Sequence, residues 1–129
     1  MSTVMYSIVP PHAPAAIGPY SHAVGWGSMV FVSGQLPVDP TSGEITGSDP
    51  GIQARQAILN IEAILEAAGS DLTRVVKTTV LLVDMSHFDA VNTVYESMFL
   101  GEVLPARACY QVAALPKGAL VEIEAIAVT

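Results

Sequence analysis

The middle of the chain carries apolar residues at helical spacing, with polar residues between them. The apolar stripe consists of Ile58, Ile61, Ile64, Leu65 and Ala68. Asp49 is a suitable N-cap, Pro50 suits the first helical position, and Gly69 is a suitable stop. These signals predict a helix that begins at Pro50 and ends just before Gly69.

A shorter stretch further along the chain shows the same spacing. Its apolar face consists of Phe88, Val91, Tyr95 and Met98. The four residues 86–89 (SHFD) resemble a capping box, in which Ser86 would be the N-cap. We therefore predict a second helix from about Ser86 to about Phe99.

Segments rich in β-branched or alternating apolar residues predict strands on both sides of these helices. Residues 75–83 (VVKTTVLLV) predict a largely buried central strand. The other predicted strands are residues 3–9, 20–26, 29–33, 107–112 and 120–128. The order β-β-β-α-β-α-β-β indicates one α+β domain over residues 1–129, with a mixed sheet that two helices cover on one face.

The last predicted strand has two different faces. Val121, Ile123, Ala125 and Ala127 form one face, and the other consists of Leu120, Glu122, Glu124, Ile126 and Val128. The second face is apolar enough to be buried as well, against neighbouring copies of the chain. It nevertheless carries two glutamates, which require an explanation.

Composition points to self-association. Only 13% of the 129 residues are charged, where about 25% is usual for a soluble domain, and 51% are hydrophobic. A small protein with so few charges can cover its surface by burying part of it against copies of itself. We therefore expect a homo-oligomer.

Charge and cysteine content limit the partners and the compartment. The net charge of −7 repels nucleic acid, and no basic cluster offsets it. No apolar run approaches the roughly 18–20 residues of a membrane span. A single cysteine, Cys109, rules out an intrachain disulfide, and three scattered histidines make a zinc site improbable. We expect a cytoplasmic protein without a metal.

Residues for catalysis are expected near the C-terminus. Alternation places Arg107, Cys109 and Gln111 on one face of their strand. If the last two strands form a hairpin that pairs Cys109 near Glu122, then a guanidinium, a thiol and a carboxylate meet on one patch of sheet. On spacing alone, a cross-strand ion pair between Arg107 and Glu122 is the favoured interpretation.

The C-terminal segments 105–110 (PARACY), 115–118 (LPKG) and 121–127 (VEIEAIA) resemble the signature of the Rid (YjgF) family. Its members are reactive-intermediate deaminases, also named L-PSP endoribonucleases. The likeness continues through residues 16–21 (AIGPYS), 32–37 (VSGQLP), 53–56 (QARQ), 76–80 (VKTTV) and 91–92 (VN). It covers nearly the whole chain in the expected order.

The resemblance implies a chorismate-mutase-like α+β fold that assembles as a homotrimer. Sheets would line a central barrel, and active-site clefts would lie between subunits. It also implies hydrolysis of imines and enamines such as 2-aminocrotonate, the activity of a 2-iminobutanoate/2-iminopropanoate deaminase. The products would be 2-keto acids and ammonia, and no cofactor or metal would be needed.

The resemblance also assigns roles to individual residues. Arg107 would bind the substrate carboxylate as a bidentate ion pair, and the strand at Cys109 would offer backbone groups. Glu122 would position the attacking water or move protons. The residues expected to line the cleft, partly from the adjoining subunit, are Tyr20, Ser33 and Asn92.

Two features depart from the family pattern. His22 stands where glutamine is more usual, beside the cleft tyrosine, and residues 100–104 form a short connection at the cleft rim. The alternative functions are a regulatory trimer that binds small carboxylates without catalysis, and a ribonuclease. The acidic chain disfavours the ribonuclease.

Overall fold

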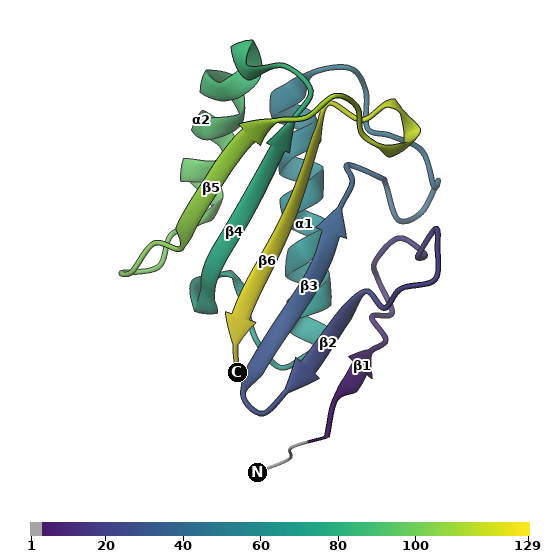
Figure 1. Cartoon of the computed structure of the whole chain (residues 1–129), viewed down its shortest axis with the longest axis vertical. Coiled ribbons are helices and arrows are strands. Elements are labelled where there is room, and N and C mark those ends of the chain that lie inside the picture. The colour runs from purple at the N-terminus through teal and green to yellow at the C-terminus, as the bar shows by residue number, and fades with distance from the viewer. Residues whose placement is uncertain (1–3) are drawn as a thin grey trace.

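The computed structural model describes residues 4–129 and contains one six-stranded sheet with the strand order β1-β2-β3-β6-β4-β5 (Figure 1). The strands are β1 (Tyr6–Ile8), β2 (Ala23–Trp26), β3 (Met29–Gln35), β4 (Val75–Leu82), β5 (Ala106–Gln111) and β6 (Val121–Val128). Only β4 and β5 pair in parallel, so the sheet is mixed, as predicted. Thr3, where the first strand was expected to begin, lies outside the described residues.

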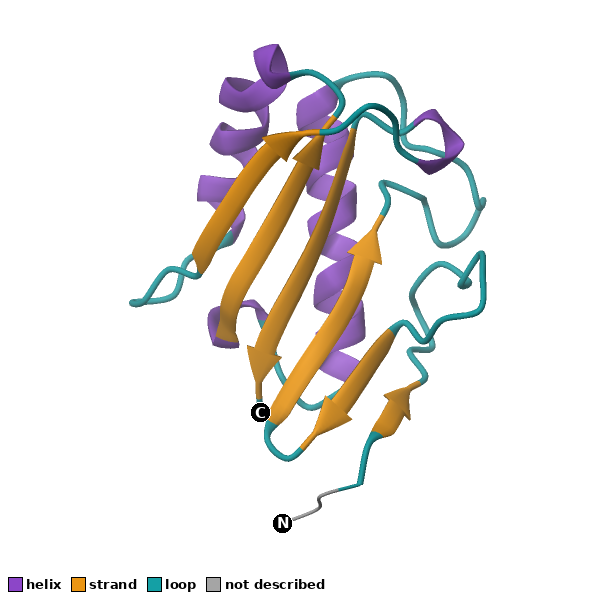
Figure 2. Ribbon diagram, in the orientation of Figure 1, coloured by secondary structure: helices purple, strands orange, loops and turns teal. Residues whose placement is uncertain are grey.

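Two α-helices within residues 4–129, α1 (Pro50–Ala67) and α2 (Phe88–Met98), lie side by side on one face of the sheet (Figure 2). The capping signals of α1 are confirmed. The Asp49 carboxylate accepts a hydrogen bond from the amide of Ile52 at 2.9 Å, and Gly69 ends the helix with a φ of +79°. The predicted α+β layering is therefore correct. No helix of the described part of the chain is both long and apolar enough to cross a membrane.

The predicted start of the second helix was wrong. Residues Met85–His87 form a 3-10 turn, and α2 begins at Phe88 without a side-chain cap. The amide of Ser86 donates to the Asp84 carboxylate at 2.8 Å, so Ser86 is the recipient of a cap rather than its source. Asp84 is therefore the N-cap of the 3-10 turn that precedes α2.

The core lies between the sheet and the two helices. Ile58, Ile61, Ile64 and Leu65 of α1 are fully buried there, against the inner face of β6. That inner face consists of Val121, Ile123, Ala125 and Ala127, all of them buried. The alternation of the last strand thus predicted its buried face correctly.

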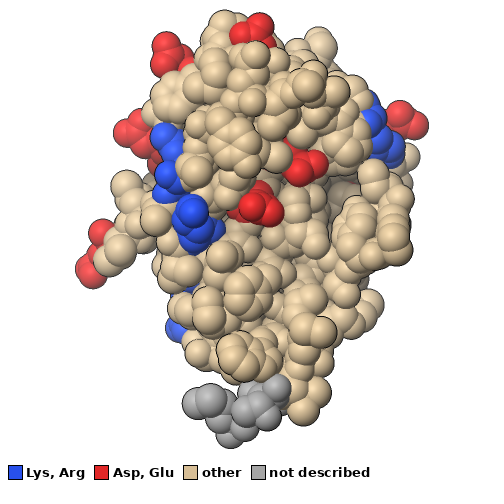
Figure 3. Space-filling view, viewed as in Figure 1, with Lys and Arg blue, Asp and Glu red and all other residues tan. Residues whose placement is uncertain are grey.

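The opposite face of the sheet is covered by no other element of residues 4–129. Trp26 and Tyr110 are each 53% exposed, and Phe31 is 40% exposed. Register places Phe31 beside Ile126, so large apolar side chains share this open face. Figure 3 shows it as mostly neutral, with a few acidic atoms near its centre. Burial of this face would account for the scarcity of charge in the sequence.

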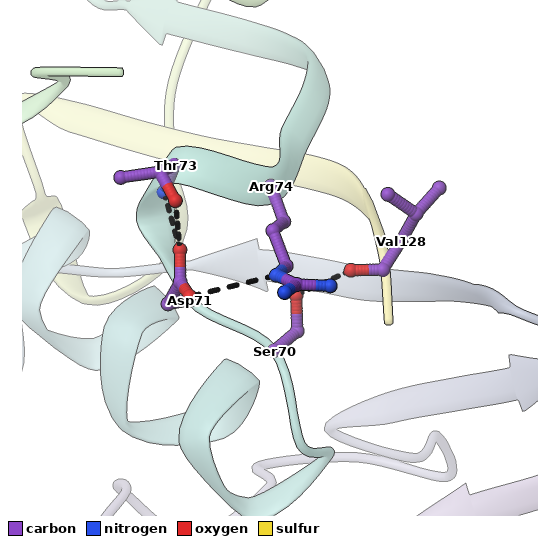
Figure 4. Close-up of polar contacts among 5 residues, drawn as sticks. All are labelled: Ser70, Asp71, Thr73, Arg74 and Val128. Carbon is purple, nitrogen blue, oxygen red and sulfur yellow. Dashed lines mark hydrogen bonds and ion pairs between the residues drawn. The ribbon is translucent and has the colours of Figure 1, made fainter.

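The turn after α1 fastens the end of β6. The Ser70 hydroxyl donates to the carbonyl of Val128 at 2.6 Å (Figure 4). Beside it, the Asp71 carboxylate accepts hydrogen bonds from the amide and the hydroxyl of Thr73. Arg74 lies 3.7 Å from Asp71, an exposed pair that contributes little to stability. The C-terminal strand is therefore held at its end as well as along its length.

Candidate active site in two halves

The last two strands do not form a hairpin. β4 lies between β5 and β6, so Cys109 pairs with Val80 on one side and Glu122 pairs with Leu81 on the other. The conditional pairing of Cys109 near Glu122 was therefore wrong. The physical reason is the parallel β4–β5 pair, whose strands are joined by a crossover through α2. The chain that follows β5 must then cross the end of β4 before it forms β6, so β5 and β6 are not neighbours in the sheet.

Arg107 and Glu122 consequently lie on opposite faces of the sheet. Arg107 is in register with Thr78, a fully buried residue on the helix-covered side. Glu122 is in register with Leu81, one of the residues of the open face. The expected ion pair between Arg107 and Glu122 is absent, and Arg107 forms no ion pair with any carboxylate of residues 4–129.

The first half-site surrounds Arg107. Its Nη1 atom donates to Oδ1 of Asn92 at 2.8 Å, and its Cζ atom lies 4.8 Å from the ring centroid of Tyr95 and 5.5 Å from that of Phe88. The guanidinium is exposed at a hollow of about 350 Å³. The hollow is lined by Asn92, Tyr95, Glu96, Phe99, Leu104, Pro105 and Arg107. The structure thus brings Asn92 and Arg107 together, as expected of two residues of one cleft.

Cys109 lies on the same face as Arg107 but is turned toward the core. Burial raises the pKa of its thiol, and the nearby Arg107 offsets part of that rise. The side chain therefore remains a neutral thiol near pH 7 and is a poor nucleophile. Because β5 is an edge strand of the sheet, the backbone along its outer edge pairs with no other strand of residues 4–129. Backbone groups, rather than the thiol, are what this position offers a ligand.

The second half-site surrounds Glu122. A hollow of about 360 Å³ is lined by Ile17, Tyr20, Ser33, Gly34, Leu36, Pro116, Glu122 and Glu124. Burial raises the pKa of the Glu122 carboxyl, and the charge of Glu124 raises it further. A carboxyl with a raised pKa binds its proton more tightly than an ordinary glutamate, which suits it to taking up and returning a proton.

Gly34 makes room for that carboxyl. A Cβ atom at position 34 would lie 2.5 Å from Oε2 of Glu122 and 2.9 Å from its carboxyl carbon. Any other residue would force the carboxyl to move. No role was assigned to Gly34 from the sequence, because the contact depends on the pairing of β3 with β6.

Ser33 and Tyr20 share this second hollow, and both also hold the chain before β2. The Ser33 hydroxyl donates to the carbonyl of Ser21 at 2.6 Å, and the Tyr20 hydroxyl accepts from the amide of Ile17 at 3.2 Å. The Nε2 atom of His22 lies 2.6 Å from the carbonyl oxygen of Pro14. The strand predicted from Tyr20 begins instead at Ala23, so Tyr20 belongs to a loop.

Comparison with known proteins places the chain in a family. The family model described as Endoribonuclease L-PSP matches residues 10–129. The chain belongs to this family. It is 52% identical to the 2-iminobutanoate/2-iminopropanoate deaminase of Mus musculus, and the match covers 99% of the chain and 95% of that protein.

Solved structures agree with this family assignment. YyfA of Yersinia pestis, a member of the conserved Rid protein family, superposes with a TM-score of 0.94. It is 41% identical, with 98% of this chain and 100% of that chain covered. E. coli TdcF with bound serine gives a TM-score of 0.91 at 46% identity, with 96% and 98% covered. The predicted α+β fold, a mixed sheet with two helices on one face, therefore agrees with that of Rid proteins.

The contacts of two rings with Arg107 were not assigned from the sequence of this family member. Phe88 and Tyr95 were read as core positions of α2, yet both rings also contact Arg107. In the 100–104 connection, Leu100, Val103 and Leu104 are 75%, 81% and 64% exposed, and Leu104 lines the Arg107 hollow. Within residues 4–129, no group of three or more His, Cys, Asp or Glu side chains is placed to hold a metal.

Proposed function

We propose that the protein is a 2-iminobutanoate/2-iminopropanoate deaminase that works as a homotrimer. The observation that carries this proposal is the exposed guanidinium of Arg107, which is held by Asn92 and has no carboxylate partner among residues 4–129. An exposed arginine with no carboxylate partner is suited to a carboxylate ligand. The curated name of the mouse relative supplies the reaction class.

In this proposal Arg107 binds the carboxylate of a 2-imino acid. Asn92 occupies Nη1 of the guanidinium, and the remaining N–H groups stay available for two parallel hydrogen bonds. The similar E. coli TdcF was solved with serine, which carries the same carboxylate beside a nitrogen-bearing carbon. Anchoring the carboxylate fixes the position of the adjacent C=N carbon.

Hydrolysis then needs water to attack that carbon while the nitrogen gains protons. The oxygen of water forms a bond to the C=N carbon, and Glu122 takes a proton from it. Glu122 returns that proton to the nitrogen, which gives a carbinolamine. Glu122 then moves a second proton from the carbinolamine hydroxyl to the nitrogen, the C–N bond breaks as the C=O bond forms, and ammonia leaves a 2-keto acid. The raised pKa of Glu122 suits both directions of transfer. No cofactor or metal enters this scheme.

The two half-sites belong, in this proposal, to adjacent copies of the chain. Arg107 and Glu122 lie on opposite faces of one sheet and therefore cannot contact one small substrate within one copy. Packing of the open apolar face against neighbours would form the centre of the trimer and bring an Arg107 hollow against the next copy's Glu122 hollow. Tyr20 and Ser33 would then enter the cleft from the copy that supplies Glu122.

The ribonuclease named in the family description has less support from this chain. Its net charge of −7 would repel a polyanion, and the half-site residues include a single arginine. The proposed substrate is a small monoanion, for which one arginine suffices. A cytoplasmic location accompanies this proposal, because a chain with a single cysteine suits a reducing compartment.

The direct test follows the decay of 2-iminobutanoate, generated in place by threonine dehydratase, in the presence of semicarbazide. The protein is expected to speed the loss of the imine and lower the semicarbazone yield. The Arg107→Ala variant is expected to lose about 30-fold or more of that effect, the loss typical of breaking a partly buried charge contact. A folded oligomer with no acceleration would overturn the proposal, and saturable binding of 2-ketobutyrate by that protein would favour the regulatory alternative.

A further inference from the structure

The surface of α2 that faces β5 is built around the guanidinium of Arg107. Phe88, Asn92 and Tyr95 follow at the spacing i, i+4 and i+7, which places them on one side of the helix. All three contact Arg107, two through their rings and one through its amide oxygen. Hydrophobic packing alone would not require the cation to meet both rings.

We propose that Tyr95 and Phe88 form an aromatic slot that orients the Arg107 guanidinium for the substrate carboxylate, so that Tyr95 is a positioning residue for the reaction. This inference rests on the proposed function and adds to it the device that sets the direction of the arginine. The slot is defined by the two rings at 4.8 Å and 5.5 Å from Cζ.

Arginine needs such a device here because its side chain is exposed and its long stem has several rotamers. Ring contacts attract the charge of the guanidinium without using its N–H groups. Asn92 uses one nitrogen of the fork. The slot therefore restricts the arginine while leaving the other donors for a carboxylate, which an acidic partner in place of the rings would not do.

Tyr95 is itself held by two contacts, one through its ring and one through its hydroxyl. Its ring stacks on Phe99 with centroids 4.3 Å apart, and its hydroxyl lies 2.8 Å from Oγ1 of Thr78. Tyr95 is 8% exposed, and Thr78 is fully buried. Burial also raises the pKa of the tyrosine, which keeps the phenol neutral. The ring next to the guanidinium is thus a fixed, uncharged surface rather than a mobile side chain.

A purely structural role for Tyr95 makes a different prediction from a positioning role. Loss of core packing lowers stability but leaves the KM of the molecules that remain folded unchanged. Loss of the slot raises KM for a carboxylate substrate, because the arginine must be ordered on binding. The ratio of the change in KM to the change in kcat therefore separates the two.

The first experiment compares Tyr95→Leu with Thr78→Val in the imine assay. Tyr95→Leu is expected to raise KM about tenfold, within the range of one ring contact to a cation, with a smaller change in kcat. Thr78→Val removes the partner of the Tyr95 hydroxyl and is expected to lower Tm without raising KM. Tyr95→Phe keeps the ring and should restore KM to within about threefold of the wild-type value. An unchanged KM in Tyr95→Leu would overturn the inference.

The second experiment adds guanidinium chloride to Arg107→Ala. Free guanidinium is expected to enter the slot and restore part of the lost activity, and the double variant Arg107→Ala/Tyr95→Leu should show no such rescue. Equal rescue in both variants would contradict the slot. Should Tyr95→Leu fail to fold, Phe88→Leu, which removes the more distant ring, takes its place with a smaller expected rise in KM.

The inference can fail separately from the proposed function. If the wild-type protein hydrolyses imines and neither ring variant changes KM, the slot alone is wrong. If the wild-type protein does not hydrolyse imines, the proposed function is wrong, and calorimetric titration with 2-ketobutyrate still tests the slot. Weaker binding in Tyr95→Leu than in Thr78→Val would then support it, and equal binding would overturn it.

Discussion

The two half-sites hold their key residues by different means. Arg107 is held by side chains of one helix, through an amide oxygen and two rings, and it remains exposed. The position of Glu122 instead depends on the main chain of a neighbouring strand. Gly34 has no side chain, and the Glu122 carboxyl occupies the space that this leaves. One half-site controls the direction of a permanent charge, and the other controls the protonation of a carboxyl.

This difference predicts how each half-site responds to amino-acid substitution. Side-chain contacts around Arg107 can be weakened one at a time, so conservative changes there should give graded losses of affinity. The space beside the Glu122 carboxyl leaves no room for another atom, so a single added carbon should displace the carboxyl and cause a large loss of activity in one step. The experiments below test these expectations, beginning with the largest expected effect.

The largest effect is expected from mixing two inactive variants. If the halves of one cleft come from adjacent copies, a copy with Arg107→Ala and a copy with Glu122→Gln can together form an intact cleft. Co-refolding of equal amounts should restore activity in about a quarter of the clefts of randomly mixed trimers. Activity is measured before and after unfolding and refolding of the mixture.

The matched control is the double variant Arg107→Ala/Glu122→Gln mixed with either single variant. No such mixture contains both residues in separate intact copies, so it should stay at background. A refolded mixture of the two single variants that also stays at background would show that Arg107 and Glu122 do not act from different copies.

A smaller but abrupt effect is expected from Gly34→Ala. The added Cβ would stand 2.5 Å from Oε2 of Glu122, so the carboxyl must move. We expect about a tenfold lower kcat and a loss of roughly 1–3 kcal/mol in unfolding free energy. Gly51→Ala makes the same chemical change at the start of α1 and should leave kcat unaltered. Adding Glu122→Asp to Gly34→Ala shortens the acid and should recover stability, and no recovery would argue against this contact.

The smallest effect concerns stability and pH. Because the folded-state pKa of Glu122 is raised above its ordinary value of 4.5, protonation favours the folded chain. Its stabilising contribution is present below that value and is lost as the pH rises through the folded-state pKa. Glu122→Gln should therefore unfold at a higher denaturant concentration than the wild type at pH 7, and this advantage should vanish near pH 4. A variant less stable than the wild type at pH 7 would contradict this sign.

Much of the fold could be predicted from local pattern. The caps of α1 and the alternation of β6 each depend on neighbours within a few residues, and both were predicted correctly. The order of strands could not be predicted, because insertion of β4 between β5 and β6 depends on contacts between segments far apart in the sequence. The cap predicted for α2 failed for a local reason, since Asp84 caps the preceding 3-10 turn through the amide of Ser86.

The candidate site shows the same division. Arg107, Asn92, Glu122, Tyr20 and Ser33 were named from the resemblance, and the structure distributes them between the two hollows. Alternation predicted which residues share a strand face, but the faces of β5 and β6 could be related only through their common neighbour. The role of Gly34 could not be predicted, because the sequence around a glycine does not indicate which side chain of another strand approaches it.

The position of β6 has a consequence for how the chain is made. Of the six strands described in residues 4–129, β6 is synthesised after the other five although it lies between β3 and β4, so this sheet consists of two unconnected pieces until residues 121–128 have been synthesised. Between the synthesis of β5 and that of β6, the nascent chain has two unpaired strand edges, those of β3 and β4, and these edges are open to wrong partners. A premature stop of even a few codons before residue 121 therefore does more than shorten the chain, because it leaves two half-sheets with nothing to join them.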